Sequence, residues 1–341
     1  MIPSVTMDDV AAKVGVSRAT VSLALRRSPK ISAKRTDEIW RVAREMGFFP
    51  NVNASRLARA RQSSYGVLLA DLHNPIMAEI LDGFAPADEE SAPDIYLASG
   101  FNDVVRERKS LESFLSHRVA GVVLVGSKLE TERIQEFAAS LPTVAVGRNI
   151  PGVDSVLPDS QFGGRLVADH FLDLGHLKVA HIDGGSGAGA HGRKEAFLRR
   201  FRSIAGAATS VLPGDYTQAS GYEAAKALFA SGERPTALFA ANDLMALGAM
   251  GAAREKGLIA GVDFALCGFD DIEVAAYGYI SLTTVSYSRK EGGAIARELL
   301  QQRCTDPTRT PKVVKVRPRL LVRNTSCACN EETIVVDSDL R

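Results

Sequence analysis

The sequence contains few cysteines and no long apolar run. Its four cysteines, Cys267, Cys304, Cys327 and Cys329, are too few in 341 residues for a disulfide-stabilised scaffold. Only Cys327 and Cys329 stand close together, and we interpret them as incidental thiols because no second pair or histidines follow at zinc-ligand spacing. Apolar runs such as residues 121–126 fall far short of the roughly 18 residues that a spanning helix needs. We expect no contact with a membrane.

Signals for export and for catalysis are missing as well. The first nine residues are acidic where a signal peptide would be basic, so we expect a cytoplasmic protein. His170, His176, His181 and His191 are spread over a predicted helix, helix end, strand and loop without metal-ligand spacing. No Ser/His/Asp order stands out. We therefore expect no enzyme, no cofactor and no metal.

The composition is that of a globular protein with two or three domains, 45% apolar and 24% charged, but its charge is divided unevenly. Residues 1–61 contain 12 Lys and Arg against five Asp and Glu, a net charge of +7, whereas the remaining residues contain 29 against 35, a net charge of −6. A basic N-terminal segment on an acidic remainder is typical of a small domain that binds nucleic acid. By charge alone, a solvated basic surface would be the favoured explanation.

The basic segment has the pattern of a helix-turn-helix. Thr6 and Asp9 resemble a capping box for a helix that ends near Val14, residues 15–16 make a turn, and Ser17 caps a second helix. A third helix runs from its cap at Ser32 to Gly47, with Trp40 in the small core or at its edge. In such a motif the second helix presents its first residues to base edges in the major groove, here Arg18, Ala19, Ser22 and Leu23.

Residues 49–61 follow as a short helical pattern with three arginines and an exposed leucine, which buries nothing by itself. Taken alone, this segment favours an ordinary polar linker over a helix that orders against DNA.

The N-terminus resembles that of the lactose-repressor-type (LacI/GalR) transcription regulators. The shared residues are Val5-Thr6-Met7, Val10-Ala11, Gly15-Val16-Ser17, Thr20-Val21-Ser22, Pro50-Asn51, Ala54 and Leu57-Ala58. The resemblance implies a hinge helix in which Leu57, with Ala54 beside it, is the wedge that enters the minor groove. The predicted DNA-binding residues are Thr6, Ser17, Arg18, Ala19, Thr20, Ser22, Leu23, Asn51, Ala54 and Leu57.

One position departs from the family pattern. The residue after the Thr-Val-Ser motif is usually an arginine that contacts a base, but here it is Leu23. A leucine cannot bind guanine and can instead contact a thymine methyl, so we expect a half-site that differs from the commonest one of the family.

The remainder alternates apolar runs with helical patterns, which indicates βαβ units and parallel sheets. The runs are residues 65–70, 95–99, 121–125, 143–146, 178–182, 236–240 and 264–267. One sheet of about seven strands would fit, but residues 176–183 after a long helix at 162–174 look like a new start, so we predict two similar α/β lobes. Asn74-Pro75 should open the first helix, and Pro86 should shorten or kink it.

The resemblance extends to about residue 326. It implies an α/β fold in which an N-terminal three-helix helix-turn-helix domain (1–50) and a hinge helix (51–62) precede a two-lobed periplasmic-binding-protein-like body (63–329) with parallel sheets, and a tail (330–341). Lobe 1 would comprise about residues 63–160 and 289–319, and lobe 2 about 161–288 and 320–329, because the chain would cross between lobes near residues 160, 288 and 319.

Polar clusters at predicted strand ends indicate a ligand site between the lobes. Arg193, Asn242-Asp243 and Asp270-Asp271 each follow a strand, and together they could pair with the hydroxyls of a sugar-like ligand. By resemblance, Arg193, Asn242 and Asp270 contact the effector, and Tyr216 falls where relatives often stack an aromatic ring on it. Asp243 and Asp271 could instead cap helices, and Tyr216 could be packed at the surface.

Two nearby features have more than one reading. Arg148 either favours an anionic effector or is an ordinary surface arginine. Residues 185–190 fit a loose dinucleotide-binding glycine pattern, but without an acidic residue about 20 positions on we interpret them as a flexible loop that lines the cleft.

The sequence thus predicts a homodimeric transcription regulator that acts as a repressor and binds double-stranded operator DNA and a small sugar-like effector. Two other classes stay open: a Rossmann-type enzyme with an accessory DNA-binding head, and a sugar-binding module of transport origin. The sequence is consistent both with an effector that releases the protein from DNA and with one that promotes DNA binding.

Overall fold

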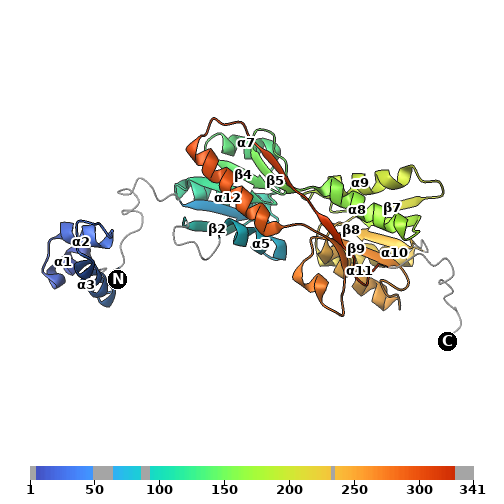
Figure 1. Cartoon of the computed structure of the whole chain (residues 1–341), viewed down its shortest axis with the longest axis horizontal. Helices are drawn as coiled ribbons and strands as arrows, with labels where there is room; N and C mark the ends of the chain where they lie inside the picture. Colours follow the sequence, from blue (N-terminus) through green and yellow to red (C-terminus); the bar gives the residue numbers. More distant parts are fainter. Residues whose placement is uncertain (1–4, 49–63, 86–92, 232–234, 327–341) are drawn as a thin grey trace. The chain divides into compact units, whose positions relative to one another are not determined.

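The chain forms two compact units, residues 1–63 and residues 64–341, which we call the head and the body. The computed structural model describes residues 5–48, 64–85, 93–231 and 235–326 (Figure 1). The predicted hinge positions Asn51, Ala54 and Leu57 lie outside the described residues, as do Cys327 and Cys329. Within the described part, no helix is both long and apolar enough to cross a membrane.

The described part of the head consists of α1 (Met7–Val14), α2 (Arg18–Leu25) and α3 (Ala33–Glu45). The predicted caps are confirmed. The backbone N–H of Thr6 donates to Asp9 Oδ2 at 2.8 Å and that of Asp9 donates to Thr6 Oγ1 at 3.3 Å, which completes the capping box. Ser17 accepts a hydrogen bond from Thr20 N–H at 3.1 Å, and Ser32 caps α3 in the same way.

A small apolar core holds the three helices together. Val10, Val21 and Ile39, one from each helix, are fully buried, and Phe48 closes the cluster. Gly15 ends α1 in the left-handed region at φ 73°, where a residue without Cβ is favoured, and the chain then turns into α2. Trp40 is half-buried, with the Arg44 guanidinium 5.5 Å from its ring centre.

Lobe 1 of the body is a six-stranded sheet in the order β11-β5-β4-β3-β1-β2, and every neighbouring pair is parallel. Its strands are β1 (Tyr65–Leu69), β2 (Ile95–Ser99), β3 (Gly121–Val125), β4 (Thr143–Val146), β5 (Asp154–Pro158) and β11 (Val313–Val316). Its helices are α5 (Pro75–Phe84), α6 (Val104–Ser116), α7 (Thr131–Ala138) and α12 (Arg289–Thr305).

Lobe 2 is a second six-stranded sheet in the order β12-β10-β9-β8-β6-β7, parallel except for the antiparallel edge strand β12. Its strands are β6 (Lys178–Ile182), β7 (Ala208–Leu212), β8 (Ala237–Ala240), β9 (Ala265–Phe269), β10 (Thr283–Ser286) and β12 (Arg319–Leu321). Its helices are α8 (Ser160–Asp173), α9 (Ala190–Arg202), α10 (Gln218–Ala230), α11 (Asp243–Glu255) and the 3₁₀ helix η1 (Glu273–Ala276).

The chain passes between the lobes three times, from β5 to α8, from β10 to α12 and from β11 to β12. In Figure 1 the last passage is the red segment that runs from the sheet with β4 and β5 to the sheet with β8 and β9. The central strands β1, β3, β4, β8 and β9 are buried along their whole length, because helices cover both faces of each sheet.

The predicted fold class is confirmed, and each of the seven predicted runs contains a strand. The single-sheet alternative is wrong, because the strands divide between two sheets. The sequence analysis missed five strands, β5, β7, β10, β11 and β12. Of these, β7, β11 and β12 carry exposed residues, which breaks the continuous apolar run that marks a central parallel strand.

Candidate functional site

A cleft of about 520 Å³ lies between the carboxyl ends of the two sheets. Lobe 1 contributes residues that follow β1, β2 and β3, and lobe 2 contributes residues that follow β6, β7 and β9. Three of the predicted effector residues, Arg193, Tyr216 and Asp270, line this cleft. Parallel strands end at one edge of a sheet, so loops far apart in the sequence meet there.

Arg193, on the first turn of α9, is held at the base of the cleft with only 4% of its surface exposed. Its Nη1 donates to the carbonyl of Ala241 at 2.5 Å, and its guanidinium carbon lies 3.5 Å from the ring centre of Phe269. Its Nε is buried and has no hydrogen-bond partner among the described residues. A buried charged donor without a partner is costly, and so this group is available to a ligand.

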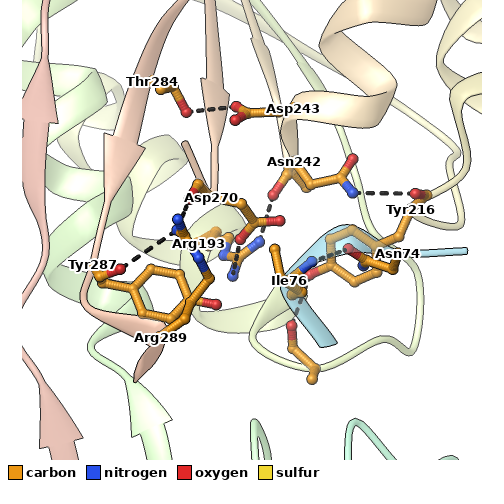
Figure 2. Close-up of polar contacts among 12 residues, drawn as sticks. Asn74, Ile76, Arg193, Tyr216, Asn242, Asp243, Asp270, Thr284, Tyr287 and Arg289 are labelled. Carbon is orange, nitrogen blue, oxygen red and sulfur yellow. Dashed lines mark hydrogen bonds and ion pairs between the residues drawn. The ribbon is translucent and has the colours of Figure 1, made fainter. Parts of the chain in front are cut away.

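Asp270 lies beside Arg193 and is 3% exposed, with its Oδ1 at 3.8 Å from Arg193 Nη2 (Figure 2). This Oδ1 has no hydrogen-bond partner among the described residues. Burial raises the pKa of Asp270 to about 6, against the lowering effect of Arg193 and Arg289. Its backbone φ of 117° lies where L residues are rarely found, and strain of this kind gathers at binding sites.

Tyr216 is clamped by the glycine loop after β6. A Cβ on Gly184 would lie 2.4 Å from the Tyr216 ring, and one on Gly187 would lie 2.2 Å from it. The phenol donates to the carbonyl of Ala188 at 2.8 Å, and burial raises its pKa to about 12. The ring thus supports the loop and lines the cleft at the same time. Tyr216 is thus packed against the loop and also lines the cleft, and its contact with a ligand stays a prediction.

Asn242 contributes indirectly. Its Oδ1 accepts from Met245 N–H at 2.9 Å as the cap of α11, and its Nδ2 donates to the Tyr216 carbonyl at 3.1 Å (Figure 2). Asn242 is not among the described residues that line the cleft. It holds the strained Tyr216 backbone, whose φ is 73°, against α11.

The helix-cap readings of Asp243 and Asp271 are wrong. Asn242 is the cap of α11, and Asp243 is fully buried one residue later, where it accepts from Thr284 Oγ1 at 2.5 Å and from Ile272 N–H at 2.9 Å. Burial, followed by the charge of Asp270, raises the pKa of Asp243 to about 7. Asp271 binds the guanidinium of Arg323 at 2.6 Å.

The sequence analysis missed the polar groups that lobe 1 brings to the cleft. Asp71 follows β1 and accepts from Asn102 Nδ2 at 2.9 Å, and Lys128 follows β3. Lys128 lies on the lobe 1 side, and its charge acts on Asp215 of lobe 2. Their position just after predicted strands was a signal that could have identified them. Arg148, by contrast, is bound to the carbonyls of Ser127 and Leu129 at 2.8 and 2.6 Å.

Arg289, at the start of α12, connects the cleft floor to lobe 1 and is also absent from the sequence analysis. It donates to the carbonyls of Asp270 and Asp271 of lobe 2 and pairs through Nε with Glu79 of α5 at 2.9 Å. Figure 2 shows Arg289 between Asp270 and Tyr287. The buried guanidinium of Arg289 is bonded to both lobes. A displacement of Asp270 would therefore be transmitted through Arg289 to α5.

In the head, the start of α2 presents its side chains to solvent. Ser17, Arg18 and Ala19 are exposed, and Thr20, Ser22 and Leu23 are half-buried. Arg18 lies 3.5 Å from Asp8 with both side chains mostly exposed, so the pair is weak and the cation is available. Thr6 sits at the start of α1 and remains exposed beside its capping bonds.

Within the described residues no cluster of three His, Cys, Asp or Glu side chains could hold a metal ion. The cleft offers cationic, carboxylate and amide side chains, a set suited to hydrogen bonding with a polar molecule; the charged ones are Arg193, Lys128, Asp71, Asp215 and Asp270.

Comparison with known proteins agrees with this architecture. Residues 6–51 match the model for bacterial regulatory proteins of the lacI family, and residues 168–326 match the periplasmic binding protein-like domain. The HTH-type transcriptional repressor PurR of Aliivibrio fischeri (strain MJ11) is 26% identical over 328 residues, which cover 94% of this chain and 97% of that protein.

Two solved structures are similar to this chain in fold as well as in sequence. The lac repressor dimer bound to operator and the anti-inducer ONPF matches with a TM-score of 0.82 at 26% identity, over 96% of this chain and 100% of that one. The transcriptional regulator CelR in complex with cellobiose matches with a TM-score of 0.69 at 26% identity, over 94% and 100%. With the helix-turn-helix head, the two-lobed body and these matches, the chain belongs to the lacI family of bacterial regulatory proteins.

Proposed function

We propose that the protein is a DNA-binding transcriptional repressor whose operator affinity is controlled by a sugar-like molecule bound in the cleft. The observation that carries the effector half of this proposal is the pair of buried, unsatisfied atoms in the cleft, Arg193 Nε and Asp270 Oδ1. A donor and an acceptor side by side match neighbouring hydroxyls, which can accept from one and donate to the other.

The DNA half of the proposal rests on the head. Its net positive charge would attract the phosphate backbone, and the exposed start of α2 would enter the major groove with Arg18, Ala19 and Ser22. Thr6, Ser17 and Thr20 would contact the backbone beside it, and Leu23 would meet a thymine methyl. Asn51, Ala54 and Leu57 would act in the hinge helix.

The cleft chemistry favours a sugar over a flat aromatic ligand. Arg193 covers one face of the Phe269 ring, and Gly184 and Gly187 pack on the Tyr216 ring, so each of these rings already stacks on a group of the protein. The CelR relative holds cellobiose, whereas other relatives are named as PurR, so a purine base is the natural comparison ligand. In this proposal Arg193 and Asp270 bind hydroxyls, Tyr216 shapes the wall and Asn242 positions Tyr216.

Coupling between the halves requires a homodimer on a pseudo-palindromic operator, as the lac repressor relative is a dimer on its operator. The effector shifts the protein between a form that binds operator and one that does not, by binding one of them more tightly. Arg289 is the residue through which movement at Asp270 would reach α5 of lobe 1.

The effector assignment is tested with the full chain and a matched pair of variants. Duplexes are first selected from a random pool, and the enriched operator is then titrated in gel shifts with a panel of sugars and purine bases. We expect one sugar to change operator affinity in the wild type. Asp270→Asn should bind operator normally and lose most of this response, because the exchange replaces one carboxylate oxygen by an NH2 donor and removes the charge that strengthens a hydrogen bond from a hydroxyl.

The control is Glu136→Gln, the same chemical change on the exposed surface of α7, which should respond as the wild type does. If Asp270→Asn responds normally, the cleft assignment is wrong. If no duplex is enriched in a salt-sensitive manner under any ligand condition, the repressor assignment itself is wrong.

The hinge assignment has a test of its own. Leu57→Ala should weaken operator binding and reduce DNA bending while the sugar affinity of the body stays unchanged, since a wedge acts only on the bent duplex. Leu177→Ala, at an exposed leucine of lobe 2, serves as the control. Bend angle follows from the mobility of circularly permuted operator fragments. An unchanged bend angle and unchanged affinity in Leu57→Ala would contradict the wedge.

A further inference from the structure

A second cavity, of about 320 Å³, lies outside the cleft. It is formed by the segment that opens α8, by one face of α9 and by Lys315 of β11. None of its described lining residues belongs to the cleft. The second cavity therefore needs its own explanation.

Four cations line this cavity: Arg165 of α8, Arg199 and Arg200 of α9, and Lys315 of β11. Arg200 is paired with Asp169, its Nε lying 2.5 Å from the carboxylate. Among the described residues, no carboxylate pairs with Arg165, Arg199 or Lys315. The cavity thus holds three cations that are free to bind an anion.

Arg165 is held in place by an aromatic ring rather than by an acid. Its guanidinium lies 4.9 Å from the ring centre of Phe162, and the guanidinium of Arg317 lies 4.7 Å from the same ring. Phe162 lines the cavity, so it fixes two cations at the rim and leaves their N–H groups unpaired. Such an arrangement orders an arginine without neutralising it.

Acidic groups do not balance these charges. Asp159 is the carboxylate that lines the cavity, and its Oδ1 is occupied by the N–H of Phe162 at 3.1 Å as the cap of α8. The residues after position 61 carry a net charge of −6, so a positive cavity is not a consequence of the overall composition. Like charges gathered in a concave site repel one another, and an anionic ligand relieves that repulsion.

We propose that this cavity binds a small molecule that carries two or more phosphate groups. Guanidinium groups pair with phosphate oxygens through a planar fork of donors, and lysine adds a mobile point charge. The charge of +3 on the three unpaired cations exceeds the charge of about −2 on one phosphate group, so a ligand with two or more phosphate groups matches it better. The concave shape and the volume of about 320 Å³ fit a small ligand.

The location gives the site a means to act on the body. Lys315 belongs to the sheet of lobe 1, whereas Arg165 and Arg199 belong to helices of lobe 2. Two of the three passages between the lobes, from β5 to α8 and from β11 to β12, start beside the cavity. A polyanion bound there would join the lobes and change the free energy of their movement, and by reciprocity the cleft ligand would change its affinity.

The test uses the full chain and inorganic pyrophosphate as the probe, titrated by calorimetry in metal-free buffer of low ionic strength. The variant is Arg199→Gln/Lys315→Gln, which removes two exposed cations that hold no described carboxylate. The control is Arg108→Gln/Lys109→Gln, which removes the same charge from the exposed face of α6. Since Trp40 is the single tryptophan, its fluorescence reports pyrophosphate bound to the basic head separately.

We expect one pyrophosphate per body, with at least about tenfold weaker binding in Arg199→Gln/Lys315→Gln and less than about twofold change in the control. Orthophosphate should bind more weakly than pyrophosphate. The proposal is overturned if the wild-type body binds no pyrophosphate or if both double variants lose affinity equally. Neither operator nor sugar enters the test, so its failure leaves the repressor assignment standing.

Discussion

Replacing Asp243 by asparagine should remove a pH dependence from the stability of the body. Asp243 is fully buried, its Oδ2 accepts from Ile272 N–H, and its Oδ1 accepts from the hydroxyl of Thr284. An asparagine keeps the shape and both contacts, since its oxygen can accept from Ile272 and its amide can donate to the Thr284 oxygen. The exchange therefore removes the ionisable group and little else.

The magnitude follows from the pKa of Asp243, which burial raises from 3.8 to about 7. A carboxyl group whose pKa is higher in the folded state stabilises the fold below its unfolded pKa and loses that contribution as the pH rises through the folded pKa. At about 1.4 kcal/mol for each pH unit, the full loss is about 4 kcal/mol, of which about 3 kcal/mol falls between about pH 5 and pH 8. As the pH rises through this interval, the free energy of unfolding of Asp243→Asn should increase by about 3 kcal/mol relative to that of the wild type.

Urea unfolding followed by far-ultraviolet circular dichroism measures the difference, because the tryptophan signal comes from the head alone. His181 acts in the opposite direction: burial lowers its pKa to about 4, so its contribution is present above about pH 6.5 and is lost as the pH falls. Both proteins contain His181, so its contribution cancels when the free energies of unfolding of the two proteins are subtracted. Parallel curves for the two proteins from about pH 5 to pH 8 would refute the reasoning.

Two further predictions concern stability. Thr6→Ala should lower the free energy of unfolding of the head by about 1 kcal/mol through loss of the capping box, measured by the fluorescence of Trp40, and an unchanged midpoint would contradict the role of the cap. Asp154→Ala should cost the body about 3–5 kcal/mol, because it leaves the mostly buried Arg303 and Arg309 without their shared carboxylate, at 2.9 and 2.7 Å. Thermal unfolding by circular dichroism measures this loss, and a change below about 1 kcal/mol would refute it.

The sequence predicts the local features well. Thr6, Ser17 and Ser32 cap the head helices as expected, and Asn74 caps α5, because a cap depends on residues three positions apart or fewer. The central strands were also predicted, because a strand covered on both faces is apolar at every position.

Long-range features were not predictable in the same way. No local pattern around Asp243 predicts its hydrogen bond with Thr284. No local pattern around Arg289 predicts its ion pair with Glu79, 210 positions away. The edge strands β11 and β12 are recognised only once their partners are known, since exposed residues interrupt them. The Arg193 and Asp270 positions were reached by resemblance, whereas their unpaired atoms required the three-dimensional arrangement.

The interleaved connectivity also has a consequence for synthesis. The sheet of lobe 1 gains its edge strand β11 and its covering helix α12 only after nearly all of lobe 2 has been translated. On the ribosome, the face of β3, β4 and β5 that α12 covers would therefore stay exposed until residue 305 emerges, and the edge of β5 would stay unpaired until residue 316 emerges. A nonsense codon anywhere upstream of that residue would deprive the first lobe of its last strand as well as truncating the second.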